Sequence, residues 1–134
     1  MELASGGSSS RTLEQFLRSQ KPKPDENVSR VTEMVYAVAQ ERGILHVQDL
    51  VERYGLNKRT LQRLFATYVG VSPKWVIQRY RLHEAAEQLA IRGSASQAEL
   101  ALTLGYSDQA HFVRDFKAIV GVTPAAYARA AQDA

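Results

Sequence analysis

The sequence has 134 residues, a formal net charge of +3 and 45% hydrophobic residues. This length and composition predict one compact domain. The chain contains no cysteine, which excludes disulfides, thiol catalysis and cysteine-ligated zinc or iron–sulfur sites. No apolar run approaches the ~20 residues that a membrane span requires, and the N-terminus lacks a secretory signal. We therefore expect a soluble, cytoplasmic protein without membrane contact.

The N-terminal residues 1–26 are predicted to be a flexible linker or the remnant of an absent sensor domain. Residues 1–10 are rich in glycine and serine, and residues 11–20 could form a short amphipathic turn. The prolines at positions 22 and 24 disfavour helix in the residues that precede them. The folded domain is expected to occupy residues 27–134.

Helical periodicity begins at Val28 and continues to the C-terminal region, with apolar residues at spacings of three and four. The expected helices cover about 28–42, 47–54, 58–69, 73–91 and 97–104. Gly55 suits the turn after the second of these helices, and Asn57 can cap the third. Ser72 and Pro73 are typical of a helix start, as is the later pair Thr123-Pro124. No strand pattern is present, so the predicted fold is all-α with about seven helices.

The second half of the chain repeats the first. Leu100 and Gly105 follow Leu50 and Gly55 by fifty positions, and from Arg114 onward the offset from the first copy is fifty-one. Each copy fits a helix-turn-helix, in which a positioning helix, a tight turn and a second helix present side chains to a DNA major groove. We expect these motifs at about 47–70 and 97–121, as two lobes joined by the long central helix at about 73–91.

The segment Arg53–His83 carries a concentrated positive charge. It contains seven arginines and lysines and no aspartate or glutamate. Such a segment favours a polyanionic partner over a catalytic pocket. The sequence therefore indicates DNA binding, with one recognition helix in each lobe.

The residues predicted to contact bases lie on the outward faces of the two recognition helices. Arginine pairs bidentately with guanine and glutamine with adenine, and small apolar side chains can contact a thymine methyl group. The candidates in the first lobe are Arg59, Thr60, Gln62 and Arg63. The candidates in the second lobe are Gln109, Ala110, Val113 and Arg114. Asp108 and Asp115 make the second lobe less basic, so we expect it to bind less selectively.

Four further basic residues are candidates for contacts with DNA phosphates, namely Lys58, Lys74, Arg79 and Lys117. Arg81 has two open interpretations, a place near DNA or a structural tie between the lobes through a carboxylate.

Histidines and aromatic residues receive structural interpretations. His46, His83 and His111 lack the spacing of a metal site, and His111 is expected to be packed or backbone-bonded near the DNA-facing surface. Trp75, Tyr80 and Tyr106 are expected in the core rather than as stacking platforms.

Beyond these patterns, the chain resembles the C-terminal DNA-binding domain of the AraC/XylS family of bacterial transcription regulators over about residues 28–130. The resembling motifs of the first lobe and central helix are Leu61-Gln62-Arg63-Leu64-Phe65, Gly70-Val71-Ser72-Pro73, and Arg81-Leu82 with Ala86 and Leu89. Those of the second lobe are Leu100-Ala101, Leu104-Gly105-Tyr106-Ser107-Asp108, His111-Phe112, Arg114, Phe116-Lys117 and Gly121-Val122-Thr123-Pro124. The sequence departs from the family pattern at two places. His46 stands where serine or threonine is common, and the connection after the central helix, Gly93-Ser94-Ala95, carries no distinctive residues. The resemblance implies a seven-helix, two-lobed domain that binds promoter DNA and contacts RNA polymerase.

The predicted function is a sequence-specific transcription regulator that binds double-stranded promoter DNA as a monomer and contacts two successive major grooves. The alternative is a helical protein–protein or RNA polymerase-contacting module without sequence specificity of its own. We expect neither an enzyme nor a cofactor, because the sequence has no serine–histidine, paired-carboxylate or glycine-rich phosphate motif.

Overall fold

The computed structural model describes residues 24–133 of the chain. Within that range it contains seven α-helices, one short 3-10 helix and no strand, which confirms the all-α prediction. The α-helices are α2 (Pro24–Gln40), α3 (Val47–Tyr54), α4 (Lys58–Tyr68), α5 (Pro73–Arg92), α6 (Gln97–Thr103), α7 (Gln109–Val120) and α8 (Pro124–Asp133). The 3-10 helix η1 covers Ser94–Ser96.

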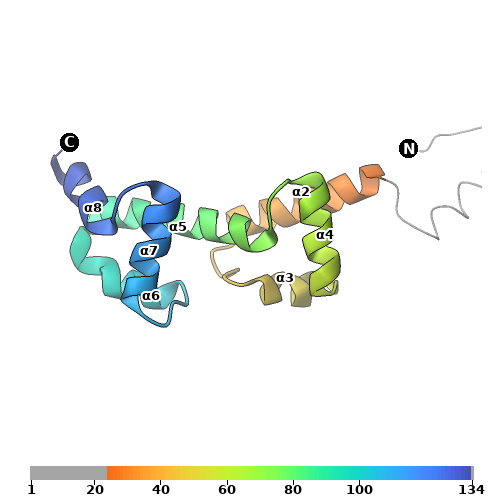
Figure 1. Ribbon diagram of the computed structural model, residues 1–134, viewed down its shortest axis with the longest axis horizontal. Helices are drawn as coiled ribbons and strands as arrows, with labels where there is room; N and C mark the ends of the chain where they lie inside the picture. The colour runs from red at the N-terminus through yellow and green to blue at the C-terminus, as the bar shows by residue number, and fades with distance from the viewer. Residues whose placement is uncertain (1–23, 134) are drawn as a thin grey trace, which may run out of the picture.

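Two lobes share the central helix α5 (Figure 1). Helices α2, α3 and α4 pack around its first half, and α6, α7 and α8 pack around its second half. Each lobe has its own hydrophobic core, the first ending at Ile77 of α5 and the second beginning at Leu82. Phe65 in the first core and Phe112 in the second are fully buried. Burial of each such side chain contributes about 1.5–3 kcal/mol, so each lobe is stabilised separately.

Helix α2 begins earlier than its apolar periodicity predicts. The first residue is Pro24 rather than Val28, and the last is Gln40 rather than a residue near 42. Proline is well tolerated at a first helical position, and Asp25 and Glu26 complement the positive end of the helix dipole. The helix thus takes up three residues that we assigned to the linker, while the amphipathic turn predicted at 11–20 lies outside the described residues.

The caps predicted for α4 and α5 are confirmed. The side chain of Asn57 accepts a hydrogen bond from the Thr60 amide at 2.8 Å, and Ser72 Oγ accepts one from the Trp75 amide at 3.1 Å. Gly55 has a φ of 66°, the left-handed conformation that glycine adopts without strain. These signals fix where the first recognition helix begins and where the chain turns back into α5.

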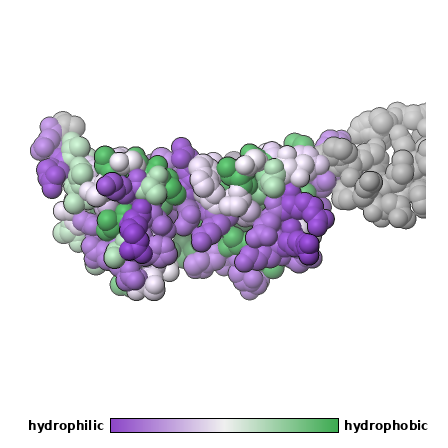
Figure 2. Space-filling view, viewed as in Figure 1, coloured by the Kyte–Doolittle hydropathy of each residue, from purple (hydrophilic) through white to green (hydrophobic). Residues whose placement is uncertain are grey.

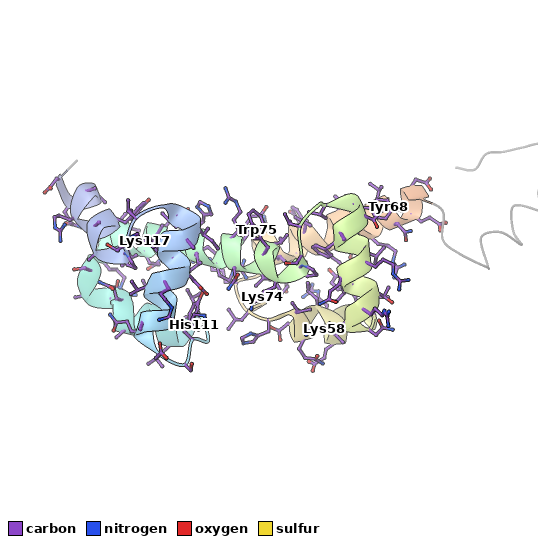
Figure 3. The ribbon with its side chains drawn as sticks, in the orientation of Figure 1. Lys58, Tyr68, Lys74, Trp75, His111 and Lys117 are labelled. Atoms are coloured by element: carbon purple, nitrogen blue, oxygen red, sulfur yellow. The ribbon has the colours of Figure 1, made fainter. Side chains whose placement is uncertain are left out.

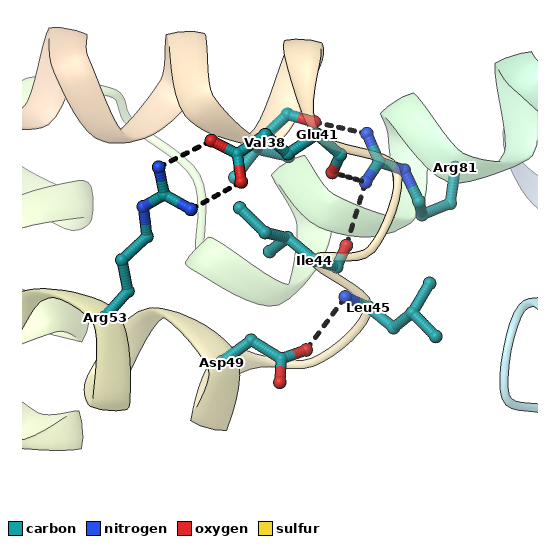
Figure 4. A network of polar contacts seen from close by, with 7 residues as sticks. All are labelled: Val38, Glu41, Ile44, Leu45, Asp49, Arg53 and Arg81. Atoms are coloured by element: carbon teal, nitrogen blue, oxygen red, sulfur yellow. Dashed lines mark hydrogen bonds and ion pairs between the residues drawn. The ribbon is translucent and has the colours of Figure 1, made fainter.

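Asp49 compensates for the absence of a good cap residue at His46. Its carboxylate accepts hydrogen bonds from the backbone amides of Leu45 and His46, each at 2.9 Å. Figure 4 shows the first of these contacts. The turn before α3 is therefore held by an acid inside the helix.

Arg81 is buried and anchors the C-terminal end of α2 (Figure 4). Its guanidinium donates to the carbonyl oxygens of Glu41 at 2.6 Å, Ile44 at 2.9 Å and Val38. It also pairs with Glu84, on the same helix, at 3.1 Å. Burial lowers the pKa of this arginine, while Glu84 acts in the opposite direction. Of our two interpretations the structural one holds, with a correction: the main partners are backbone carbonyls of the first lobe, not a carboxylate between the lobes.

Trp75 and Tyr80 are exposed to 40% and 36%, so the prediction that they belong to the core is wrong. For Trp75 the cause is a change in the buried face of α5. Trp75 follows the helical spacing of Leu82 and Leu89, but this face is buried only in the second lobe. In the first lobe the buried positions include Val76 and Ile77, roughly half a turn around the helix axis from that face.

Candidate nucleic-acid interface

The outward face of α4 carries the four residues that the sequence proposed as base contacts. Leu61, Leu64 and Phe65 are buried against the first core, as predicted. The side chains of Arg59, Gln62 and Arg63 are exposed, and Thr60 is half-buried. Arg59 and Arg63 lie one helical turn apart, so their guanidinium groups project from the same face.

Lys58 and Lys74 lie at a cleft between the two lobes. This interlobe cleft has a volume of about 500 Å³, and Leu45, His46, Gln48, Ser107 and His111 also line it. Lys58 is the first residue of α4, and Lys74 is near the start of α5. Figure 3 shows Lys58 and His111 at the same, lower side of the molecule, with Lys74 beneath α5. The N-terminal ends of α4 and α7 therefore face the same way.

Helix α7 presents a smaller polar face than α4. Phe112 and Phe116 are fully buried, whereas Gln109, Ala110 and Arg114 are exposed. A fourth candidate, Val113, is half-buried and packs against the second core. Figure 2 shows hydrophilic residues over the region of α4 and along α7, with hydrophobic residues interspersed around α7.

Asp108 and Asp115, the two acids at the start of α7 and within it, are engaged in contacts within the fold. The carboxylate of Asp108 caps α7 by accepting a hydrogen bond from the His111 amide at 2.8 Å. Asp115 Oδ2 accepts hydrogen bonds from the Tyr106 hydroxyl at 3.0 Å and from Gln78 Nε2 at 3.1 Å. Both carboxylates are therefore oriented by contacts within the fold.

The contacts of Asp115 were not apparent from the sequence, because Gln78 is 37 positions away. His111 Nε2 also lies 3.4 Å from Asp115 Oδ2, and its ring meets that of Tyr106 edge-on at 5.0 Å. Burial raises the pKa of the Tyr106 hydroxyl, and the hydrogen bond to Asp115 raises it further. Tyr106 is half-buried and packs against the second core, as expected, whereas His111 is half-exposed in the cleft.

Arg79 and Lys117 are not brought together with the other candidates. The guanidinium of Arg79 lies 5.2 Å from the centroid of the Trp75 ring. Arg79 and Trp75 line a groove of about 810 Å³ between α2 and α5, together with Tyr80. Lys117 lies toward the upper end of α7 in Figure 3, away from His111 at the lower end. Two of the four predicted phosphate contacts thus flank the interlobe cleft, and two lie elsewhere.

Two of the seven basic residues of Arg53–His83 serve the fold of the first lobe. Arg81 is buried as described above. The guanidinium of Arg53 forms a bidentate ion pair with the Glu41 carboxylate, with both N–O distances at 2.5 Å (Figure 4). The positive charge that remains outward on α4 and at the cleft comes from Lys58, Arg59, Arg63 and Lys74.

None of the helices in the described part of the chain has the length and apolar character of a membrane-spanning segment.

The chain matches a family model described as a helix-turn-helix domain over residues 50–130. It is 28% identical over 109 residues to the virulence regulon transcriptional activator VirF of Yersinia enterocolitica, covering 81% of this chain and 38% of that protein. It is 32% identical over 83 residues to the transcriptional activator AarP of Providencia stuartii, covering 62% of this chain and 61% of AarP.

Among solved structures, the chain resembles the C-terminal domain of AraT, a response regulator from Geobacillus stearothermophilus. The TM-score is 0.60 at 25% identity, and the match covers 81% of this chain and 86% of that domain. The chain spans about two fifths of the length of VirF. The protein therefore belongs to the AraC/XylS family of helix-turn-helix transcription regulators.

Proposed function

We propose that the protein binds double-stranded promoter DNA sequence-specifically, with α4 and α7 in two successive major grooves. The observation that carries this proposal is that both helices direct their N-terminal ends to one side of the molecule (Figure 3). Helix α5 has 20 residues and spans about 30 Å. That length suits two grooves that open on one face of the duplex about 34 Å apart.

The proposed base contacts are the eight candidates named from the sequence. On α4, Arg59, Gln62 and Arg63 have exposed side chains suited to guanine and adenine edges, with Thr60 beside them. The second set is Gln109, Ala110, Val113 and Arg114, in which the half-buried Val113 can present only part of its surface. We assign phosphate contacts to Lys58 and Lys74 and leave Arg79 and Lys117 outside the interface, because of where these side chains lie.

One chain contains two unlike recognition helices, so a monomer suffices for a non-palindromic site. RNA polymerase is the second proposed partner, since relatives such as VirF and AarP are named transcriptional activators. A protein-binding function without sequence specificity is the alternative. The groove lined by the exposed Trp75 and Tyr80 also favours protein binding as a second activity beside DNA binding.

Selection of bound molecules from a random DNA pool, followed by sequencing, tests the proposal. We expect enrichment of two unlike half-sites whose centres are about 10–10.5 base pairs apart. A pool that remains unenriched would support the protein-binding alternative. Enrichment of a single half-site would contradict the two-groove arrangement.

A further inference from the structure

The two lobes are connected by few contacts other than the backbone of α5. The first core uses α5 as far as Ile77 and the second from Leu82 onward. Gln78 lies between the two cores. It is three residues before Arg81, whose hydrogen bonds attach this part of α5 to the first lobe. Gln78 also precedes Leu82 by four residues, so its side chain points along the face that the second lobe covers. It is thus placed to join the lobes.

Asp115 is the residue of the second lobe that receives this connection. Three groups converge on its Oδ2 atom: Gln78 Nε2 of α5 at 3.1 Å, the Tyr106 hydroxyl at 3.0 Å and His111 Nε2 at 3.4 Å. They come from the central helix, the turn before α7 and α7 itself. The side chain of Asp115 is 23% exposed. A carboxylate shielded to this degree makes stronger hydrogen bonds than one in open water.

These hydrogen bonds constrain α7 in a way that its hydrophobic contacts do not. Phe112 and Phe116 hold the helix against the second core, but burial of apolar surface has little directional preference. Hydrogen bonds weaken steeply when their angles change, so the contacts of Asp115 specify rotation and tilt. Arg114, a proposed base contact, precedes Asp115 directly in the chain, so a change in the tilt of α7 would displace it.

A second close approach lies beside the Asp115 contacts. A Cβ atom placed on Gly105, in the turn before α7, would lie 3.2 Å from His46 Nε2 and 3.8 Å from Leu45 of the first lobe. The lobes therefore meet at the turns that precede α3 and α7. This contact limits how far α7 can swing toward the cleft, while Gln78 limits how far it can swing away.

We propose that Asp115 is a positioning residue that fixes α7 relative to α5 and thereby selects the half-site spacing that the protein accepts. Its carboxylate acts through Gln78 and Tyr106 and makes no contact with DNA itself. This role deepens the proposed function and rests on it for the DNA consequence. The orientation of the lobes is a property of the protein alone, so it can be measured without DNA.

The first experiment measures the distance between the recognition helices in the full chain. The sequence has no cysteine, so Ala66→Cys on α4 and Ala118→Cys on α7, both at exposed positions, give two unique sites for spin labels. Pulsed electron paramagnetic resonance then reports the distribution of distances. We expect a narrow distribution in the labelled parent, and a broader or shifted one after Asp115→Ala or Gln78→Ala. Gln40→Ala, at an exposed position of α2, is the matched control and should leave the distribution unchanged.

The second experiment measures binding to duplexes that carry the selected half-sites at spacings one or two base pairs shorter or longer than the preferred one. Asp115→Ala, Gln78→Ala and Tyr106→Phe should each reduce the discrimination between spacings, by roughly tenfold for Asp115→Ala. Base preferences within each half-site should stay as they are. Asp115→Asn keeps an acceptor oxygen and should restore part of the discrimination.

The outcomes separate this inference from the proposed function. An unchanged distance distribution in Asp115→Ala and Gln78→Ala overturns the positioning role, whatever the chain binds. The positioning role is also overturned if Asp115→Ala weakens binding by the same factor at every spacing and lowers the melting temperature. Asp115 would then have a purely structural role. If the parent selects no DNA but the variants broaden the distribution, the positioning of α7 stands and the proposed function fails.

Discussion

Arg81 carries one of the seven positive charges of Arg53–His83, yet its guanidinium faces the carbonyl oxygens of Val38, Glu41 and Ile44. Val38 belongs to the last turn of α2, where a helix leaves acceptors without intrahelical donors, and Glu41 and Ile44 belong to the turn after it. The planar guanidinium, with donors on two separate terminal nitrogens, contacts all three carbonyl oxygens. Arg81 thus contributes to stability where its charge suggested binding.

Replacement of Arg81 by methionine should therefore destabilise the first lobe. It removes the guanidinium donors of the buried Val38 and Ile44 carbonyls, while the Glu41 carbonyl keeps the Ile44 amide as a donor. We expect the free energy of unfolding to fall by about 2–4 kcal/mol. Denaturant unfolding followed by circular dichroism measures the change. The control is Arg42→Met, because Arg42 is exposed and lies 3.9 Å from Glu84. If both variants lose the same small amount, the contacts of Arg81 do not support the fold.

Tyr106 should make the stability of the second lobe depend on pH in the alkaline range. Burial and the hydrogen bond to Asp115 raise its pKa above the ordinary value of 10.0. Below pH 10 the folded and unfolded chains both keep the proton. Above it the unfolded chain loses the proton first, so the free energy of unfolding should fall as the pH rises. Thermal melts between pH 9 and 11 should show a smaller decline for Tyr106→Phe than for the parent. Parallel declines would mean that Tyr106 titrates normally.

At the scale of elements, α4 and α7 differ in how much of their outward face can contact bases. Helix α4 presents Arg59, Gln62 and Arg63, all exposed, whereas α7 presents Gln109, Ala110 and Arg114 beside the half-buried Val113. Long side chains that carry several donors discriminate bases more strongly than small apolar ones. We therefore attribute more of the specificity to α4.

Arg63→Ala should weaken binding to the selected site by about 1–3 kcal/mol and relax base preference at one position. The reason is the loss of a bidentate pair with a base edge. Fluorescence anisotropy with the selected duplex and a scrambled one measures the difference. Arg53→Ala is the matched control, since Arg53 is paired with Glu41. Equal losses on both duplexes would make Arg63 a phosphate contact.

Arg114→Ala should change base preference about one helical turn away from the position that Arg63 affects. This follows from the placement of α4 and α7 at opposite ends of α5 (Figure 1). Repeated selection with the variant, or footprinting on the selected site, locates the change. If only the Arg63 half-site changes, α7 does not enter the second groove.

Local sequence signals predicted most of the elements. Asn57, Ser72 and Gly55 mark boundaries through contacts within three or four residues, and those boundaries lie where expected. The exposed face of α4 followed from the spacing of the buried Leu61 and Phe65. Such features could be predicted because their physical causes lie within one or two helical turns.

Other features depend on how the helices pack and escaped prediction. Trp75 and Tyr80 were both expected in the core, but α5 changes its buried face between Ile77 and Leu82 and leaves both partly exposed. The hydrogen bond between Gln78 and Asp115 joins residues 37 positions apart, which come together only when α7 packs against α5. The placement of Arg79 and Lys117 away from the cleft has the same origin, because it depends on which face of each helix a neighbour covers.

At the scale of the whole molecule, the outward positive charge of the first lobe should govern how binding depends on salt. Lys58 and Lys74 flank the cleft, and Arg59 and Arg63 project from α4. Contacts between such groups and phosphates release counterions, so log K should fall linearly with log salt concentration. Titrations at several salt concentrations measure the slope. Lys74→Ala should lower its magnitude by about 1, with the same effect on every DNA sequence. A flat plot would contradict DNA binding.

Trp75 is the one tryptophan of the sequence, and it lies in the groove between α2 and α5 with Arg79 beside its ring. The intrinsic tryptophan fluorescence of the protein therefore originates from this groove rather than from the interlobe cleft. Its emission should stay constant while α4 and α7 bind a duplex, and shift to shorter wavelength when another protein covers the groove. A single optical signal can thus distinguish occupation of the groove from occupation of the DNA-facing surface.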